Sequence, residues 1–145
     1  MVETACKLVG KVNYFWGGKS YVIGWDPRWG TLQKVTSPES SASGTYRPYG
    51  LDCSGFLDWA LRNAGLHSDG NWYIGRNLTT VSLADAQPGD FALYPDASHI
   101  SVVVGRNAAV KLLICHCFYG ISNVVVTEFS AFDFTTVGQQ AFMES

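Results

Sequence analysis

The spacing of apolar side chains divides the chain into a helical first part and a strand-rich second part. Residues 2–9 place apolar side chains on one helical face before Gly10, and residues 53–64 do the same before Gly65. From residue 91 onward the period is that of β-strands, which we expect at residues 91–94, 99–105, 110–118 and 123–129, with a short fifth strand within 137–143. Helices followed by an antiparallel meander predict an α+β fold, with the helices packed on one side of a sheet of about five strands.

Two stretches, residues 19–51 and 66–83, show no regular period. The first holds Trp25 and Trp29, followed by the small polar stretch 37–45, which we interpret as a surface loop too short to be a domain linker. The chain has 145 residues and contains no internal repeat. We therefore expect one domain spanning residues 1–145 with a real core.

Charge and hydropathy exclude two classes of function. The chain has 10 Lys and Arg against 12 Asp and Glu, for a formal net charge of −2, and none of these forms a basic stripe. We therefore expect no nucleic-acid binding. No apolar run approaches the length of about 20 residues that a membrane-spanning helix needs, so we expect no membrane insertion. We expect a monomer.

Cys53 stands where a helix begins. Asp52 is a good N-cap residue, and the helical period starts directly after it, so Cys53 occupies the first helical position. Unpaired backbone N–H groups and the positive end of the helix dipole converge there, which favours thiolate over thiol. Cys53 is therefore the candidate nucleophile.

A cysteine nucleophile needs a base within hydrogen-bond reach, and the chain has three histidines. We interpret His67, in a polar loop, as a solvated surface residue. His99 opens a predicted strand, and His116 lies in an apolar one, on the face opposite Cys115 and Cys117. If the two strands are neighbours, the two imidazoles are adjacent. A buried histidine with satisfied hydrogen bonds explains His116 nearly as well.

The remaining cysteines have a plainer interpretation. Cys115 and Cys117 point to one side of an apolar strand, and we favour buried free thiols over a disulfide framework. A zinc site formed by Cys115, His116 and Cys117 fits poorly, because alternate strand residues point apart. We expect no metal.

Four motifs in order resemble those of one family of cysteine peptidases. They are Tyr14-Phe15-Trp16-Gly17-Gly18, then Leu51-Asp52-Cys53-Ser54-Gly55-Phe56, then Gln87-Pro88-Gly89-Asp90-Phe91, and lastly His99-Ile100-Ser101-Val102-Val103-Val104-Gly105. Together they resemble the NlpC/P60 family of cell-wall cysteine peptidases in order and approximate spacing over nearly the whole chain. The chain departs from the family pattern at Ser101, where glycine is usual, and in the long insertion between Gly18 and Asp52.

The resemblance implies a papain-like α+β fold and a thioester mechanism without a cofactor. It assigns Cys53 as the nucleophile, His99 as its base and His116 as the residue that orients His99. Tyr14 is implied at the site, and the residues matching Asp52 and Ser54 help to hold the free amino end of the substrate. The implied substrate is a peptidoglycan stem peptide, cut at a bond involving D-glutamate and a diamino acid.

Other functions remain open at the level of the sequence. Related papain-like domains include N-acetylmuramoyl-L-alanine amidases and acyltransferases, which share the Cys and His residues. A non-catalytic wall-binding domain and the zinc-binding module are more remote alternatives. The implied location is extracellular, at the cell wall. The amino terminus has no signal-peptide pattern, so we expect either another route of export or a catalytic domain belonging to a longer secreted or phage protein.

Overall fold

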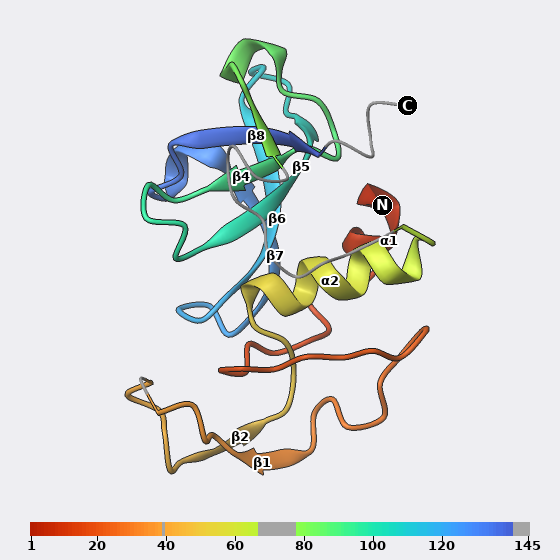
Figure 1. Cartoon of the computed structure of the whole chain (residues 1–145), viewed down its shortest axis with the longest axis vertical. Helices are drawn as coiled ribbons and strands as arrows, with labels where there is room; N and C mark the ends of the chain where they lie inside the picture. Colours follow the sequence, from red (N-terminus) through yellow and green to blue (C-terminus); the bar gives the residue numbers. More distant parts are fainter. Residues whose placement is uncertain (39, 67–77, 141–145) are drawn as a thin grey trace.

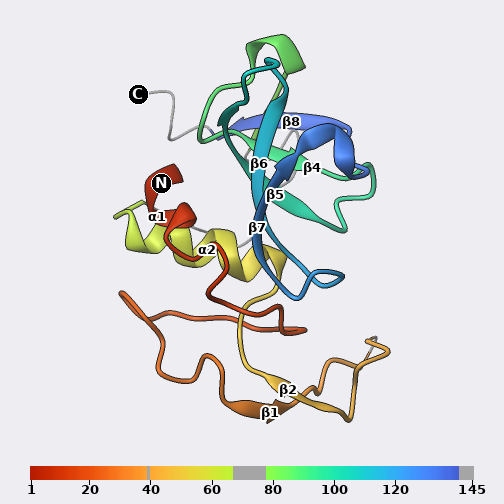
Figure 2. The ribbon, with the colours of Figure 1, turned by 180° about the vertical axis from the view of Figure 1, so that it is seen from behind.

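Two helices lie between a six-stranded sheet and a small hairpin. The computed structural model describes residues 1–38, 40–66 and 78–140. Helices α1 (Val2–Cys6) and α2 (Cys53–Asn63) pack on one face of the large sheet, and the hairpin of β1 (Leu32–Lys34) and β2 (Tyr46–Pro48) lies on the far side of α2 (Figure 1). The same three layers are seen from behind in Figure 2. The expected α+β class, with helices on one side of the sheet, is confirmed.

The large sheet is antiparallel throughout and has the strand order β3-β8-β4-β5-β6-β7. Its strands are β3 (Leu78–Val81), β4 (Phe91–Leu93), β5 (Ile100–Arg106), β6 (Leu112–Phe118), β7 (Asn123–Glu128) and β8 (Thr136–Gln140). The expected meander is confirmed for β4 to β7. It is wrong for the last strand, because β8 returns across the sheet to pair with β4.

Three strands of the structure fall in stretches that show no period in the sequence. β3 adds a sixth strand within residues 66–83, where it pairs with β8, and β1 and β2 form the hairpin within residues 19–51. Both hairpin strands have only three residues, and none of these six side chains is fully buried. Such short, solvated strands show no alternation to detect. Among the residues that the structure describes there are also two short 3-10 helices, η1 (Leu83–Asp85) and η2 (Phe129–Ala131).

Helix α1 is shorter than the sequence predicts, and α2 is as predicted to within one residue. After Cys6 the backbone N–H groups bond to carbonyls three residues back, so the expected helix over residues 2–9 tightens into turns before Gly10. Helix α2 begins at Cys53 and ends before Gly65, which has the positive φ of a C-terminal glycine. Neither helix has the length and apolar character needed to span a bilayer, among the residues that the structure describes.

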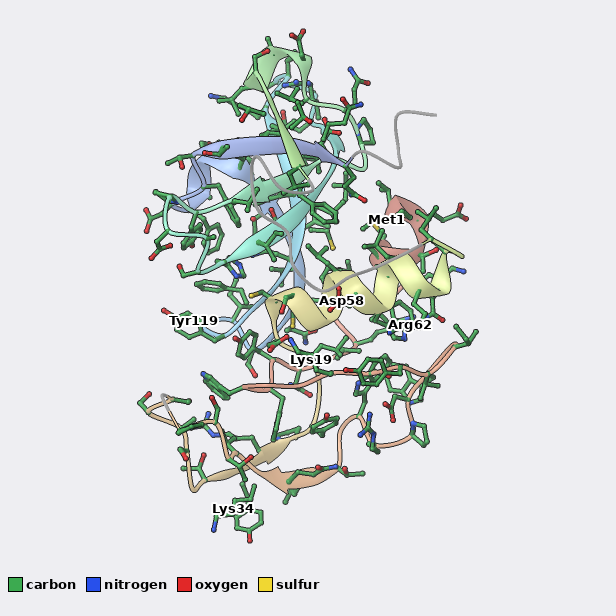
Figure 3. All side chains as sticks on the ribbon, viewed as in Figure 1. Met1, Lys19, Lys34, Asp58, Arg62 and Tyr119 are labelled. Atoms are coloured by element: carbon green, nitrogen blue, oxygen red, sulfur yellow. The ribbon has the colours of Figure 1, made fainter. Side chains whose placement is uncertain are left out.

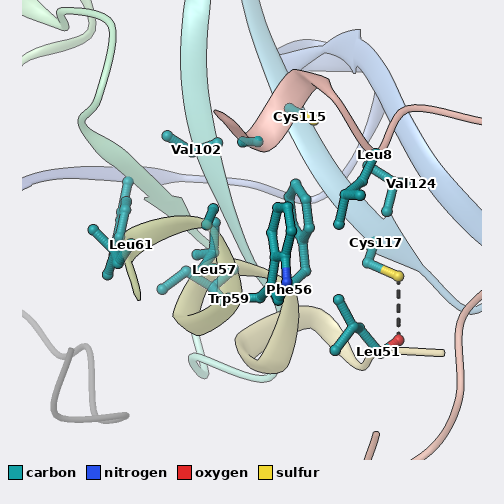
Figure 4. Close-up of a cluster of buried hydrophobic side chains, with 14 of the residues drawn as sticks. Leu8, Leu51, Phe56, Leu57, Trp59, Leu61, Val102, Cys115, Cys117 and Val124 are labelled. Carbon is teal, nitrogen blue, oxygen red and sulfur yellow. Dashed lines mark hydrogen bonds between the residues drawn. The ribbon is translucent and has the colours of Figure 1, made fainter. Parts of the chain in front are cut away.

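Each face of the sheet carries its own apolar cluster. The α2 side chains of Phe56, Leu57 and Leu61 are fully buried against the face that carries Val102, Cys115 and Cys117 (Figure 4). Cys115 and Cys117 are buried free thiols, as expected. The opposite face is covered by the segment after β7, which contributes Phe129 and Phe134. Burial of this kind, at roughly 25 cal/mol per Å² of apolar surface, is the main source of stability.

The chain entering α2 lies in direct backbone contact with the segment 13–15. The Leu51 N–H donates to the Asn13 carbonyl at 3.1 Å, and the Phe15 N–H donates to the Leu51 carbonyl at 3.0 Å. Gly50 permits this approach, because a Cβ at that position would lie 1.8 Å from the Asn13 carbonyl oxygen. No side chain fits there without separating the two segments.

We expect Gly50→Ala to lower the free energy of unfolding by about 3 kcal/mol, since the new methyl group forces the two backbones apart. Urea unfolding monitored by tryptophan fluorescence measures the change. Gly65→Ala is the control, because its Cβ would meet no atom within 4 Å and only its positive φ is unfavourable. It should cost about 1 kcal/mol. Equal losses for the two variants would show that the backbone contact at Gly50 is not needed.

Candidate active site

The candidate nucleophile is held at the first position of α2 by contacts on both sides of it. The Asp52 carboxylate caps the helix, with its Oδ1 accepting from the Gly55 N–H at 2.7 Å. The preceding Leu51 carbonyl also accepts from the Cys117 thiol of β6 at 3.2 Å, as the dashed line in Figure 4 marks. Cys53 is half-buried between the sheet and the segment 13–18. Its N–H, at the helix start, has no carbonyl of its own helix to bond.

A tight turn between β4 and β5 positions His99 at the end of the sheet. The Tyr94 N–H donates to the His99 carbonyl at 3.1 Å, and the Ala97 N–H donates back to the Tyr94 carbonyl at 3.0 Å. Within the turn, Ala97 adopts a positive φ of 58°, and the Asp96 carboxylate accepts from the Ser98 N–H at 3.0 Å. His99 is 6 % exposed at the point where β5 begins. The turn therefore fixes the direction in which its imidazole projects.

A chain of three side chains crosses strands β5, β6 and β7 behind His99. His99 Nε2 lies 2.8 Å from His116 Nδ1, and His116 Nε2 lies 2.9 Å from Thr127 Oγ1. The strands carrying the two histidines are paired neighbours, and the structure brings the rings together as the sequence suggests. For His99 Nδ1 to carry a free lone pair, His99 must donate through Nε2 to His116, which then donates through Nε2 to Thr127. This arrangement leaves Nδ1 of His99 free to accept a proton.

Burial keeps both imidazoles neutral. It lowers the pKa of His99 from 6.5 to about 4, and burial together with the neighbouring His99 lowers the pKa of His116 to about 3. Phe132 and Phe134 pack against the ring of His116, with centroids 4.9 and 5.5 Å away. At neutral pH the pair therefore acts as an acceptor of protons, which is the state that a general base requires.

The Cys53 thiol also favours its neutral form, against expectation. Burial, and secondarily the carboxylate of Asp52, raise its pKa. Backbone N–H groups of Ile100 and Ser54 and the ammonium of Lys19 act in the opposite direction but do not outweigh them. The expected resting thiolate is therefore wrong, because desolvation of the sulfur and the nearby Asp52 carboxylate outweigh the groups that stabilise the thiolate. Proton loss from Cys53 then depends on a base.

Tyr14 lies beside the nucleophile in its protonated form. Burial raises the pKa of its phenol, and the nearby Cys53 and Asp52 raise it further. Its ring contacts Trp16 and Tyr119 edge-on, with centroids 5.2 and 6.1 Å away. Tyr14 consequently offers an O–H donor next to the sulfur.

An aromatic groove opens at His99. A cavity of about 440 Å³ is lined by Tyr14, Tyr94, Ser98, His99, Phe118, Tyr119, Ala131, Phe132 and Asp133. Tyr94, Phe132 and Asp133 also line a second cavity of about 660 Å³ beside it. Figure 3 shows Tyr119 at the N-terminal end of α2. A groove of this size can receive a short peptide.

A charged cluster flanks Cys53 on the other side. The ammonium of Lys19 lies 2.7 and 2.9 Å from the two Asp52 oxygens and 2.9 Å from the Ser54 hydroxyl. Asp52 and Ser54, which the resemblance implies as contacts of a substrate amino end, both bind the ammonium of Lys19 in this structure.

The structure thus brings Cys53, His99, His116, Tyr14, Asp52 and Ser54 into one region. His67 lies outside the described residues. Sequence reasoning missed Thr127, whose neighbour relation to His116 depends on the pairing of β6 with β7. It also missed Lys19, although this residue directly follows the Gly17-Gly18 motif. Cys115 and Cys117 face the α2 side of the sheet, whereas His116 packs among the aromatic rings of the other face.

Two comparisons identify relatives of the sequence. The model of the NlpC/P60 family matches residues 10–116. A probable endopeptidase of Mycobacterium tuberculosis is 36% identical over 99 residues, which cover 66% of this chain and 24% of that protein. The chain therefore spans about a quarter of the length of the curated relatives that it matches.

Solved structures show the same fold at low sequence identity. The peptidoglycan hydrolase RipB from Mycobacterium tuberculosis is 22% identical with a TM-score of 0.62, covering 95% of this chain and 61% of that one. RipD from the same organism, described as a non-catalytic NlpC/p60 domain protein adapted to peptidoglycan binding, is 17% identical with a TM-score of 0.61, covering 97% and 93%. This likeness supports the papain-like fold that the resemblance implied.

The buried imidazole of His116 predicts a specific acid sensitivity. Because its pKa is about 3 in the folded chain and 6.5 when unfolded, the unfolded state takes up the proton first as the pH falls. We expect the wild type to lose roughly 3 kcal/mol of stability relative to His116→Asn between about pH 6.5 and about pH 4. Urea unfolding of both proteins across this range measures the difference. Parallel stability curves would contradict the buried neutral state of His116.

Proposed function

Because this chain belongs to the NlpC/P60 family, we propose that it is a cysteine endopeptidase that hydrolyses an amide bond in peptidoglycan stem peptides. Hydrolysis or binding of peptidoglycan is the common theme of the structural relatives named above. The catalytic residues we propose are Cys53, His99 and His116. They belong to the matched segment, residues 10–116.

The observation that carries this proposal is the hydrogen bond between His99 and His116 beside the start of α2. A buried pair of neutral imidazoles joined at 2.8 Å is costly to keep without a use, since each ring must give up hydration. The alternative, that His116 merely fills the core, leaves unexplained why its partner is the residue at the groove. A non-catalytic binding domain has no need of a base aligned in this way.

The proposed reaction passes through a thioester. The Cys53 thiol gives its proton to Nδ1 of His99 as the sulfur attacks the scissile carbonyl carbon. His116 accepts from Nε2–H of His99 and so stabilises the imidazolium that forms. The imidazolium then protonates the departing amine, and the C–N bond breaks. Water attacks the thioester with His99 as base, and the proton returns to the Cys53 sulfur as the acid product leaves.

The developing oxyanion needs hydrogen-bond donors, and we propose two sources of them. The N–H groups at the start of α2 supply one set, and the Tyr14 phenol, protonated because burial raises its pKa, supplies the other. Loss of one such donor typically costs about 2.7–4 kcal/mol of transition-state stabilisation. We propose the aromatic groove at His99 as the path of the stem peptide on one side of the scissile bond.

Within this function, we propose that the bond joins D-glutamate to a diamino acid, at the cell wall or outside the cell. Mass spectrometry of fragments released from purified peptidoglycan tests this choice directly. Cleavage within the stem supports the endopeptidase. New L-alanine amino ends on intact stems would instead identify an N-acetylmuramoyl-L-alanine amidase.

Cys53→Ala should abolish fragment release while leaving the protein folded, because alanine suits the first helical position. Release of soluble muropeptides and circular dichroism measure the two effects. Cys6→Ala is the matched control, since Cys6 is an exposed free thiol at the end of α1, and it should retain wild-type activity. Undiminished hydrolysis by Cys53→Ala would refute the proposed nucleophile.

Thr127 should act as a positioning residue for His116. In Thr127→Val the His116 Nε2–H loses its acceptor at 2.9 Å, so the tautomer that serves His99 is less favoured. We expect kcat to fall by about 10-fold with little change in KM, and Thr127→Ser to restore it because the hydroxyl returns. Equal kcat for Thr127→Val and the wild type would mean that the hydrogen bond to Thr127 has no part in catalysis.

A further inference from the structure

The ammonium of Lys19 lies on the carboxylate of Asp52, directly beside the nucleophile. Its three N–H donors meet three acceptors, namely both Asp52 oxygens and the Ser54 hydroxyl, at 2.7 to 2.9 Å. We propose that Lys19 closes this position to a substrate ammonium, so that the enzyme selects stem peptides whose amino end is acylated rather than free. This inference rests on the proposed function and adds a specificity-determining residue to it.

Lys19 is fixed in place by its backbone as well as by its charge. The Tyr49 hydroxyl donates to the Lys19 carbonyl at 3.1 Å, and Arg28 donates to the same carbonyl at 3.2 Å. Gly55 makes room for the lysine stem, since a Cβ there would lie 3.2 Å from Lys19 Cδ. Figure 3 shows Lys19 beneath the N-terminal half of α2, whereas Lys34 lies far from it on the hairpin. The ammonium is therefore part of the site's construction.

The arrangement removes the attraction that Asp52 would otherwise offer to a cation. The side chain of Asp52 is 16% exposed, and that of Lys19 is 38% exposed, so the pair is partly shielded from water. An incoming ammonium would find its acceptors taken and a like charge beside it, which is unfavourable. To displace Lys19, a ligand must also compete with a tethered group, whose effective concentration is on the order of millimolar.

Exclusion of a substrate ammonium would distinguish two kinds of stem peptide. In intact peptidoglycan the amino end of the stem is joined to the glycan strand through an amide, so it carries no charge. Stems already released from the glycan carry a free ammonium. A site neutralised by Lys19 accepts the first kind without repulsion and disfavours the second. The inferred substrate is therefore the stem still attached to the wall.

A pair of synthetic stem peptides tests the inference. Both begin with L-alanine and have the same sequence, one with a free and one with an acetylated amino group, and kcat/KM is measured for each by chromatography. The ratio of the two kcat/KM values is unaffected by a substitution that changes the reactivity of the enzyme toward both peptides equally. The wild type should cut the acetylated peptide at least as fast as the free one. Lys19→Met should shift the ratio toward the free amine by about 10-fold or more. Lys19→Arg, which keeps the charge, and Lys34→Met, which removes one on the hairpin, should leave the ratio as in the wild type.

Two outcomes would overturn the inference: a wild type that prefers the free amine by 10-fold or more, or a ratio unchanged in Lys19→Met. A binding measurement distinguishes failure of the inference about Lys19 from failure of the proposed function. If the wild type cuts neither peptide, the endopeptidase proposal fails. Calorimetry with Cys53→Ala then shows whether adding Lys19→Met tightens binding of the free-amine peptide by about 10-fold or more, as we expect. No tightening would count against the role of Lys19.

Discussion

The N-terminus of α2 is packed against the segment 13–18 on one side and against the sheet on the other, and these two contacts set the geometry of the site. At Gly50 the backbones touch so closely that no Cβ fits, and the Cys117 thiol of β6 holds the next carbonyl from the sheet side. Helix, loop and strand are thereby locked in one register. This packing brings Cys53 to the start of β5, where the Ile100 backbone N–H acts to lower the pKa of its thiol.

The same tight packing determines the charges of the site. Sulfur, phenol and both imidazoles are all partly or fully buried, and burial moves each pKa toward the neutral form. A resting ion pair between Cys53 and His99 is therefore not favoured, and charge has to develop during the reaction itself. Such a site depends on geometry, because a proton must move between fixed partners. The bonds from His99 to His116 and from His116 to Thr127 supply that fixed geometry.

The sequence predicts those parts of the fold that repeat a clear period over enough residues. Helix α2 and strands β5 to β7 meet this condition, and the pairing of β5 with β6 joins His99 to His116. Strand β4 has only three residues, and it is predicted as a short apolar run after the Pro88-Gly89 turn. Strands β1, β2 and β3 do not, since they are short and mostly solvated and derive their pairing from distant partners. Thr127 and Lys19 escaped notice for a related reason. Their roles arise from contacts between segments separated by 11 and 33 residues, which no local pattern records.

Asp52 shows how several demands converge on one side chain next to the nucleophile. Its Oδ1 caps α2 through the Gly55 N–H, and both of its oxygens bind Lys19. A carboxylate so close to Cys53 opposes formation of the thiolate, and it raises the pKa of the thiol. The ammonium of Lys19 acts in the opposite direction on the same sulfur. Lys19 therefore links substrate choice to reactivity. It closes the carboxylate of Asp52 to a substrate amine, and it also offsets part of the rise in the pKa of Cys53 that this carboxylate causes.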